Sequence, residues 1–131
     1  MSELAVGRTA SLTRVLDDEA VRAFADLTGD HNPVHLDDEF AATTVFGGRV
    51  AHGMLVAALF STLVAEHLPG RGTIYLEQSL RWRHPVRVGD TVVAEVEILE
   101  LGERRRVRLA TRARVGDEVV LSGEALVLAP A

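Results

Sequence analysis

The sequence predicts an α+β fold in which one long apolar helix packs against an antiparallel sheet. The helix is predicted over residues 51–68, which are apolar on nearly every side and are followed by Pro69 and Gly70. The sheet is predicted by residues 92–98 and 107–115, where inward and outward side chains alternate with a period of two. A helix this apolar needs cover on most sides, and a curved sheet supplies that cover.

The N-terminal part predicts a short strand followed by an amphipathic helix. Residues 8–15 alternate loosely, as expected for a strand. Asp17 begins a run of three acidic residues, which favours the start of a helix. Phe24 and Leu27 then follow at helical spacing, and Gly29 is suited to end the helix.

The remaining segments are expected to be loops and further strands. Residues 30–50 are rich in turn-forming residues, so we expect mostly loop there, with a short helix over about residues 37–43. Residues 72–84 and 119–128 complete the set of strands. Short turns are expected at Gly102-Glu103 and Gly116-Asp117.

Length and composition narrow the class of protein. The chain has 131 residues, 47% hydrophobic and 25% charged, which suits a single domain over residues 1–131. Cysteine is absent, which excludes disulfides, thiolate catalysis and cysteine-ligated metals. All 14 basic residues are Arg, so no lysine Schiff base or P-loop lysine is available.

Charge and hydropathy argue against nucleic-acid and membrane partners. The formal net charge is −5, whereas binding of duplex nucleic acid needs many cations against phosphate. The most apolar stretch, residues 54–65, is about half the length that spans a bilayer. The first residues do not have the pattern of a signal peptide, so we expect a cytoplasmic protein.

The segment Leu27 to His35 carries the densest chemistry in the chain. It places Asp30, Asn32 and His35 just after a predicted helix, and Pro33 keeps a regular helix from running across it. An Asp–His pair presented from such a turn can activate water and return a proton. The alternative is a capped loop in which His35 is only a satisfied polar group.

The same histidines do not predict a metal site. His31, His35 and His52 lie close in sequence, and the first two have helical spacing. Pro33 breaks the helix that would align them, so we expect no bound metal.

Gly53 stands at the start of the apolar helix. Backbone N–H groups there lack partners within the helix, and the helix dipole favours negative charge. Glycine also lets a ligand approach the backbone closely, so the position can bind the oxygen of an acyl carbonyl. The alternative is that Gly47-Gly48 and His52-Gly53 merely permit a tight turn into the helix.

Residues 24–41 also match a family signature. They read aromatic, aliphatic, small, Gly-Asp-x-Asn-Pro-aliphatic-His, with Ala six residues after His35, and every position is filled. This stretch resembles the hydratase signature of the MaoC-like family, the (R)-specific enoyl-CoA hydratases of the hotdog fold. The similarity continues through residues 41–44, 52–55, 59–61 and 75–80, and it reaches residues 85–86 and 88–90.

The resemblance implies a hotdog fold, in which a curved antiparallel sheet wraps around a long central helix, and a homodimer. It implies reversible syn addition of water to trans-2-enoyl-CoA, giving (R)-3-hydroxyacyl-CoA, with no metal or redox cofactor. The partner is then an acyl-CoA substrate or, alternatively, an acyl group on acyl carrier protein.

By position, the resemblance assigns roles to the residues found above. The N–H of Gly53 binds the thioester carbonyl, while Asp30 and His35 hold one water. His35 is the candidate base, because histidine changes charge near neutral pH. Asn32, which fixes the loop or the Asp30 carboxylate, and His52 are supporting residues. An ionised carboxylate has no proton to donate, so the sequence leaves open how the proton reaches C2.

Substrate-binding residues are assigned on weaker grounds. Ser61 and Val64 are three residues apart on the helix, so they are candidates for the wall of the acyl pocket, with core packing as the alternative for Val64. Candidates for the CoA phosphates are Arg81, Arg83 and Arg87, or else Arg104 to Arg106.

Three other functions stay open. A MaoC-like dehydratase acting on 3-hydroxyacyl carrier protein would use the same Asp–His pair. A hotdog thioesterase usually has an acid on the central helix near the thioester, but Glu66 is 14 positions beyond His52, roughly 21 Å along the helix. A non-catalytic acyl-binding subunit typically lacks the Asp or the His, and both are present here.

Overall fold

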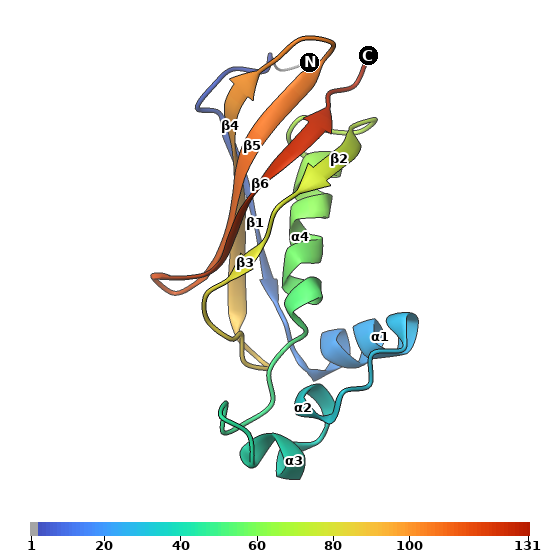
Figure 1. Cartoon of the computed structure of the whole chain (residues 1–131), viewed down its shortest axis with the longest axis vertical. Helices are drawn as coiled ribbons and strands as arrows, with labels where there is room; N and C mark the ends of the chain where they lie inside the picture. The colour runs from blue at the N-terminus through green and yellow to red at the C-terminus, as the bar shows by residue number, and fades with distance from the viewer. Residues whose placement is uncertain (1–2) are drawn as a thin grey trace.

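A curved antiparallel sheet wraps around one long helix in the computed structural model, which describes residues 3–131 (Figure 1). Three shorter helices gather at one end of the long helix. The elements in chain order are β1 (Thr9–Val15), α1 (Asp18–Thr28), α2 (Pro33–Leu36), α3 (Asp38–Ala42), α4 (Gly53–Glu66), β2 (Ile74–Gln78), β3 (Arg81–Trp82), β4 (Thr91–Leu101), β5 (Arg106–Val115) and β6 (Glu118–Leu128).

The sheet has the strand order β1-β4-β5-β6-β2, and β3 also pairs with β6. Every described pairing is antiparallel. The predicted alternation in β4 and β5 is confirmed, because one side chain in two is buried. These buried side chains are Val92, Ala94, Val96, Ile98, Val107, Leu109, Thr111 and Ala113.

The central helix α4 supplies the other half of the core. Its buried side chains are Val56, Ala57, Leu59, Phe60, Leu63 and Val64. A stripe of Met54, Ala58 and Ser61 faces outward instead, so the helix is buried on most sides but not on all of them. The helix begins at Gly53 because His52 before it is extended, and the N–H of Ala51 is donated to the carbonyl of Val86. No helix of the described residues is both long and apolar enough to cross a membrane.

The predicted first helix is confirmed as α1. The carboxylate of Asp17 accepts the N–H of Ala20, and Gly29 closes the helix with a φ of 81° that favours glycine. The predicted short helix corresponds to α3. Helix α2 was not predicted, because Pro33 was expected to prevent regular helix in this loop. Proline is compatible with the first position of a helix, where its missing N–H would have no partner within the helix.

The predicted strand over residues 72–84 is divided into β2 and β3. The break lies where Ser79 crosses Gly123 of β6. A Cβ built on Gly123 would lie 1.8 Å from the Ser79 carbonyl oxygen, so only glycine permits this approach. The crossing keeps both short strands on β6 and leads the chain toward the N-terminal end of α4.

Candidate active site

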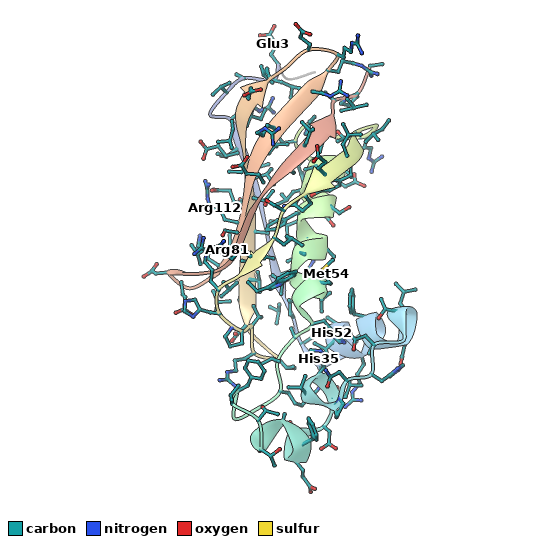
Figure 2. All side chains as sticks on the ribbon, viewed as in Figure 1. Glu3, His35, His52, Met54, Arg81 and Arg112 are labelled. Carbon is teal, nitrogen blue, oxygen red and sulfur yellow. The ribbon has the colours of Figure 1, made fainter. Side chains whose placement is uncertain are left out.

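Three side chains predicted from the sequence meet near the N-terminal end of α4. Asp30 follows α1, His35 lies on α2, and His52 is the residue that precedes α4. One oxygen or nitrogen atom of each lies within 4.8 Å of those of the other two. Figure 2 shows His35 and His52 side by side where α4 meets α1 and α2.

Local hydrogen bonds explain why Asp30 is presented from this loop. The Asp30 N–H donates to the hydroxyl of Thr28, and the Asp30 carboxylate accepts the N–H of Asn32, both at 3.3 Å. The side chain of Asn32 in turn accepts the N–H of Val34 and caps α2. Asn32 therefore links Asp30 to the helix that carries His35.

The hydrogen bond of His35 decides which ring nitrogen carries the proton. Its Nδ1 lies 2.7 Å from the carbonyl oxygen of Val50. A carbonyl can only accept, so Nδ1 is protonated and Nε2 of the neutral ring keeps its lone pair. Nε2 is thus the ring nitrogen of His35 that is left to act as a base, and one ring nitrogen of His35 lies within 4.8 Å of an Asp30 carboxylate oxygen.

His52 is almost fully buried, with 2% of its surface exposed. Its Nε2 donates to the backbone carbonyl of Asp30 at 3.0 Å. Its ring stacks on that of His35 with 3.8 Å between centroids, and the ring of Phe24 lies 4.8 Å away on a tilt. Burial lowers the pKa of His52; the hydrogen bond to Asp30 opposes this, and the nearby His35 adds to it. The ring is therefore neutral at neutral pH.

Arg49 supports the site and was not predicted. Its Nε donates to the backbone carbonyl of His35 at 2.8 Å, and its Nη2 lies 2.5 Å from Asp18 on α1. The hydrogen bonds from Arg49 and then Arg22 hold the pKa of Asp18 below its ordinary value. In the sequence, Arg49 is a single cation between a pair of glycines and the apolar helix. This arrangement has no distinctive pattern that would mark Arg49 as part of a site.

A cavity of about 390 Å³ opens beside His35 and Gly53. Most of its lining is apolar, which suits an acyl chain. Trp82 of β3, also not predicted, closes over Gly53 and donates its Nε1–H to the Gly53 carbonyl at 3.0 Å. The lining residues are Asn32, Val34, His35, Phe46, Val50, Ala51, Gly53, Val56, Trp82, Arg83, His84, Pro85, Val86, Val120 and Leu121.

The arrangement does not favour a metal ion. The rings of His35 and His52 are stacked, with 28° between their planes. The lone pairs of stacked rings lie in nearly parallel planes and do not converge on one point as metal ligands must. His31 lies apart from this cluster and contacts Asp26 at 3.2 Å.

Residues 4–120 match the model of a family described as the MaoC like domain. The chain belongs to this family. A 3-hydroxybutyryl-CoA dehydratase of Methylorubrum extorquens is 51% identical over 98% of this chain and 82% of its own length. An (R)-specific enoyl-CoA hydratase of Aeromonas caviae is 48% identical over 97% of this chain and 96% of its own length.

The fold agrees with that of solved MaoC-like structures. An (R)-hydratase from A. caviae involved in PHA biosynthesis superimposes with a TM-score of 0.95 at 47% identity, covering 99% of this chain and 100% of the other. The curved sheet around α4 is the hotdog fold that the resemblance implied.

The predicted acyl-pocket residues are separated in this MaoC-like chain. Val64 is 1% exposed and packs in the core, as the alternative interpretation of this residue expected. Ser61 lies on the outward stripe of α4. Neither residue lines the cavity beside His35, whose apolar wall is formed by other residues such as Val56 and Leu121.

The predicted phosphate-binding arginines also occupy different places. Arg83 lines the cavity, and Arg81 lies with it along a neighbouring depression. The guanidinium of Arg87 would lie 3.4 Å from a Cβ built on Gly48, outside the cavity lining. The alternative set, Arg104 to Arg106, lies at the end of the β4–β5 connection and the start of β5, at the end of the sheet away from α1, α2 and α3 (Figure 1).

Proposed function

We propose that this MaoC-like chain adds water reversibly to trans-2-enoyl-CoA and forms (R)-3-hydroxyacyl-CoA. The observation that carries the proposal is the proximity of His35, whose Nδ1 is occupied by Val50, to the Asp30 carboxylate, at the edge of an apolar cavity that His35 and Gly53 both line. The relatives named (R)-specific enoyl-CoA hydratase and 3-hydroxybutyryl-CoA dehydratase support it, because hydration and dehydration are the two directions of one reaction.

The geometry suits one catalytic water. Two atoms up to about 5.6 Å apart can share a water at ordinary hydrogen-bond lengths, and the site atoms lie within 4.8 Å of one another. His35 Nε2 takes one proton from this water, and Asp30 accepts a hydrogen bond from its other O–H. The oxygen then adds to C3, and the proton that His35 took is delivered to C2 on the same face, which returns His35 to its starting state.

Charge that develops on the thioester oxygen is stabilised at the start of α4. The N–H of Gly53 belongs to the first turn of the helix, where backbone donors lack partners within the helix. The apolar walls of the cavity exclude water from the acyl chain and strengthen this hydrogen bond. We assign Arg83 at the cavity to the phosphates of CoA, with Arg81 beside it.

We also propose that the chain forms a homodimer. The outer edge of β2 has no partner strand among the described residues, and Ile74 and Leu76 on this strand are exposed. The outward stripe of α4, which includes Met54, offers further apolar surface. Light scattering after size-exclusion chromatography should give twice the chain mass, and a monomeric mass would reject the dimer.

The activity is tested with crotonyl-CoA as substrate. Loss of the enone absorbance and formation of the (R)-alcohol, followed by chiral analysis, are expected for the wild type. Asp30→Asn should lower kcat by about 10²- to 10⁴-fold, the usual contribution of a group that handles the proton. Asp26→Asn is the matched control, because Asp26 is an exposed carboxylate whose hydrogen-bond partner among the described residues is His31.

Other results of this assay would support a different function or a different role for Asp30. Near wild-type turnover by the Asp30→Asn variant would reject the role of Asp30. Release of free CoA thiol without hydration would favour a thioesterase. Activity with 3-hydroxyacyl carrier protein but not with the CoA ester would favour the dehydratase of acyl carrier protein.

A further inference from the structure

The mechanism above uses Asp30, His35 and Gly53 but leaves His52 without a task. His52 nevertheless contacts both groups that hold the water. Its Nε2–H donates to the Asp30 carbonyl at 3.0 Å, and its ring lies flat on His35 at 3.8 Å between centroids. It therefore joins two residues that come from different elements and that lie 22 and 17 positions before it in the sequence.

His52 is a poor choice for stability alone. Its Nδ1 is buried and has no hydrogen-bond partner among the described residues. Leaving a buried polar atom without a partner costs free energy that an apolar side chain of similar size would not incur. The neighbours of the ring, such as Phe24, would accommodate an apolar residue, so the use of histidine calls for a second reason.

The contacts of His52 supply that reason. Asp30 is exposed, and the other hydrogen bonds of its loop join residues only two positions apart at 3.3 Å, so the bond from His52 ties the Asp30 backbone to the start of α4. The ring of His35 is held by one hydrogen bond to Val50 and by the stack on His52. Without His52 both the Asp30 backbone and the His35 ring lose a contact that fixes their separation.

The stack also has an electrostatic consequence. His35 becomes an imidazolium when it takes the proton of water, and the face of a neutral ring 3.8 Å away attracts a cation. A charged His52 would instead repel it. The titratable groups that act on His52 are Asp30, which favours its charged form, and His35 and His31, which oppose it along with burial.

We propose that His52 is a positioning residue that holds Asp30 and His35 at the separation needed for one water, and that it does so as a neutral ring under His35. This inference rests on the proposed hydration reaction. It assigns His52 no contact with substrate.

Two matched variants separate the hydrogen bond from the stack. His52→Gln retains a donor three bonds from Cβ, as Nε2 is in histidine, whereas His52→Met has a similar shape and no donor. We expect His52→Met to lower kcat by about 10- to 100-fold with little change in KM, because groups displaced by about an ångström react more slowly. The His52→Gln variant should recover most of this kcat.

Both variants lose the ring, so neither can stack on His35, and the difference between them reports the hydrogen bond to the Asp30 carbonyl. The unfolding midpoint of His52→Met should equal or exceed that of the wild type, since an unpaired buried nitrogen is removed.

The proposal is overturned if His52→Met retains wild-type kcat, or if its kcat falls only in step with the folded fraction. If this variant does not fold, the ring tautomers of the wild-type protein decide the question. Nitrogen NMR of the histidine rings tests the same idea without any substrate. We expect the Nε2–H tautomer for His52 and the Nδ1–H tautomer for His35, and the reverse tautomers would reject the arrangement.

The failure of the proposed function is distinguishable from the failure of this inference. If wild-type protein hydrates no thioester, the hydratase proposal fails, and the NMR measurement still decides whether His52 holds a neutral stack on His35. If wild-type protein is active and both His52 variants match it, only the role of His52 fails.

Discussion

Substitution of Gly53 by alanine is the sharpest test of how the start of α4 serves the reaction. Gly53 does not need the left-handed conformation that favours glycine, so its backbone would accept alanine. The space does not. A Cβ at this position would lie 2.7 Å from Nε1 of Trp82 and 3.0 Å from its Cε2.

The structure sets the expected size of the effect. The indole must withdraw by about 0.7 Å to restore ordinary contact, which weakens its hydrogen bond to the Gly53 carbonyl. That bond is worth about 0.5–1.5 kcal/mol, while alanine in a helix gains about 0.5–1 kcal/mol over glycine. The two nearly cancel, so the free energy of unfolding should change by less than about 1 kcal/mol.

Activity should fall much further than stability. A shift of the cavity wall against Gly53 should lower kcat/KM for crotonyl-CoA by about 10- to 100-fold, or about 1.4–2.7 kcal/mol. Gly48→Ala is the matched control, because its Cβ would meet only the flexible end of Arg87 at 3.4 Å. Trp82→Ala should remove most of the additional loss caused by Gly53→Ala. Full activity of Gly53→Ala, or strictly additive effects of the two changes, would refute the reasoning.

Three further predictions follow from other contacts. Arg49→Gln should lower both the Tm and kcat, because the backbone of His35 loses its guanidinium donor; an unchanged kcat would reject the anchoring role. Tyr75 is the only tyrosine, and burial raises its pKa to about 12, so an absorbance titration should show no tyrosinate until strongly alkaline pH. Gly123→Ala should lower the unfolding free energy by about 1–3 kcal/mol, since the Ser79 backbone must move; denaturant unfolding measures this.

Stability should also depend on pH through His52. Its pKa is lowered in the folded protein, so the folded state binds fewer protons than the unfolded state, whose His52 has its ordinary value of 6.5. This contribution to stability is complete above that pH and is lost as the pH falls below it. The free energy of unfolding, measured between pH 8 and about pH 5, should fall as the pH falls, and it should fall less steeply in His52→Met. An equal dependence on pH in both proteins would contradict this prediction.

Local pattern was enough to predict the main elements. The alternation in β4 and β5 follows from burial of one face of a sheet, and α4 follows from a run of apolar residues that ends at Pro69. The signature around Asp30 and His35 was also readable from sequence, because its residues are near neighbours in the chain. Helix α2 was missed because Pro33 both forbids a continuing helix and suits the first position of a new one.

Contacts between distant segments required the tertiary structure. Sequence spacing cannot show that His52 stacks on His35, that Arg49 joins α1 to the carbonyl of His35, or that Trp82 closes over Gly53. These contacts depend on where loops and strands far apart in the chain come together. The same reason separates Ser61 from Val64: helical spacing says which residues are neighbours on a helix, whereas the surrounding sheet decides which of them is buried.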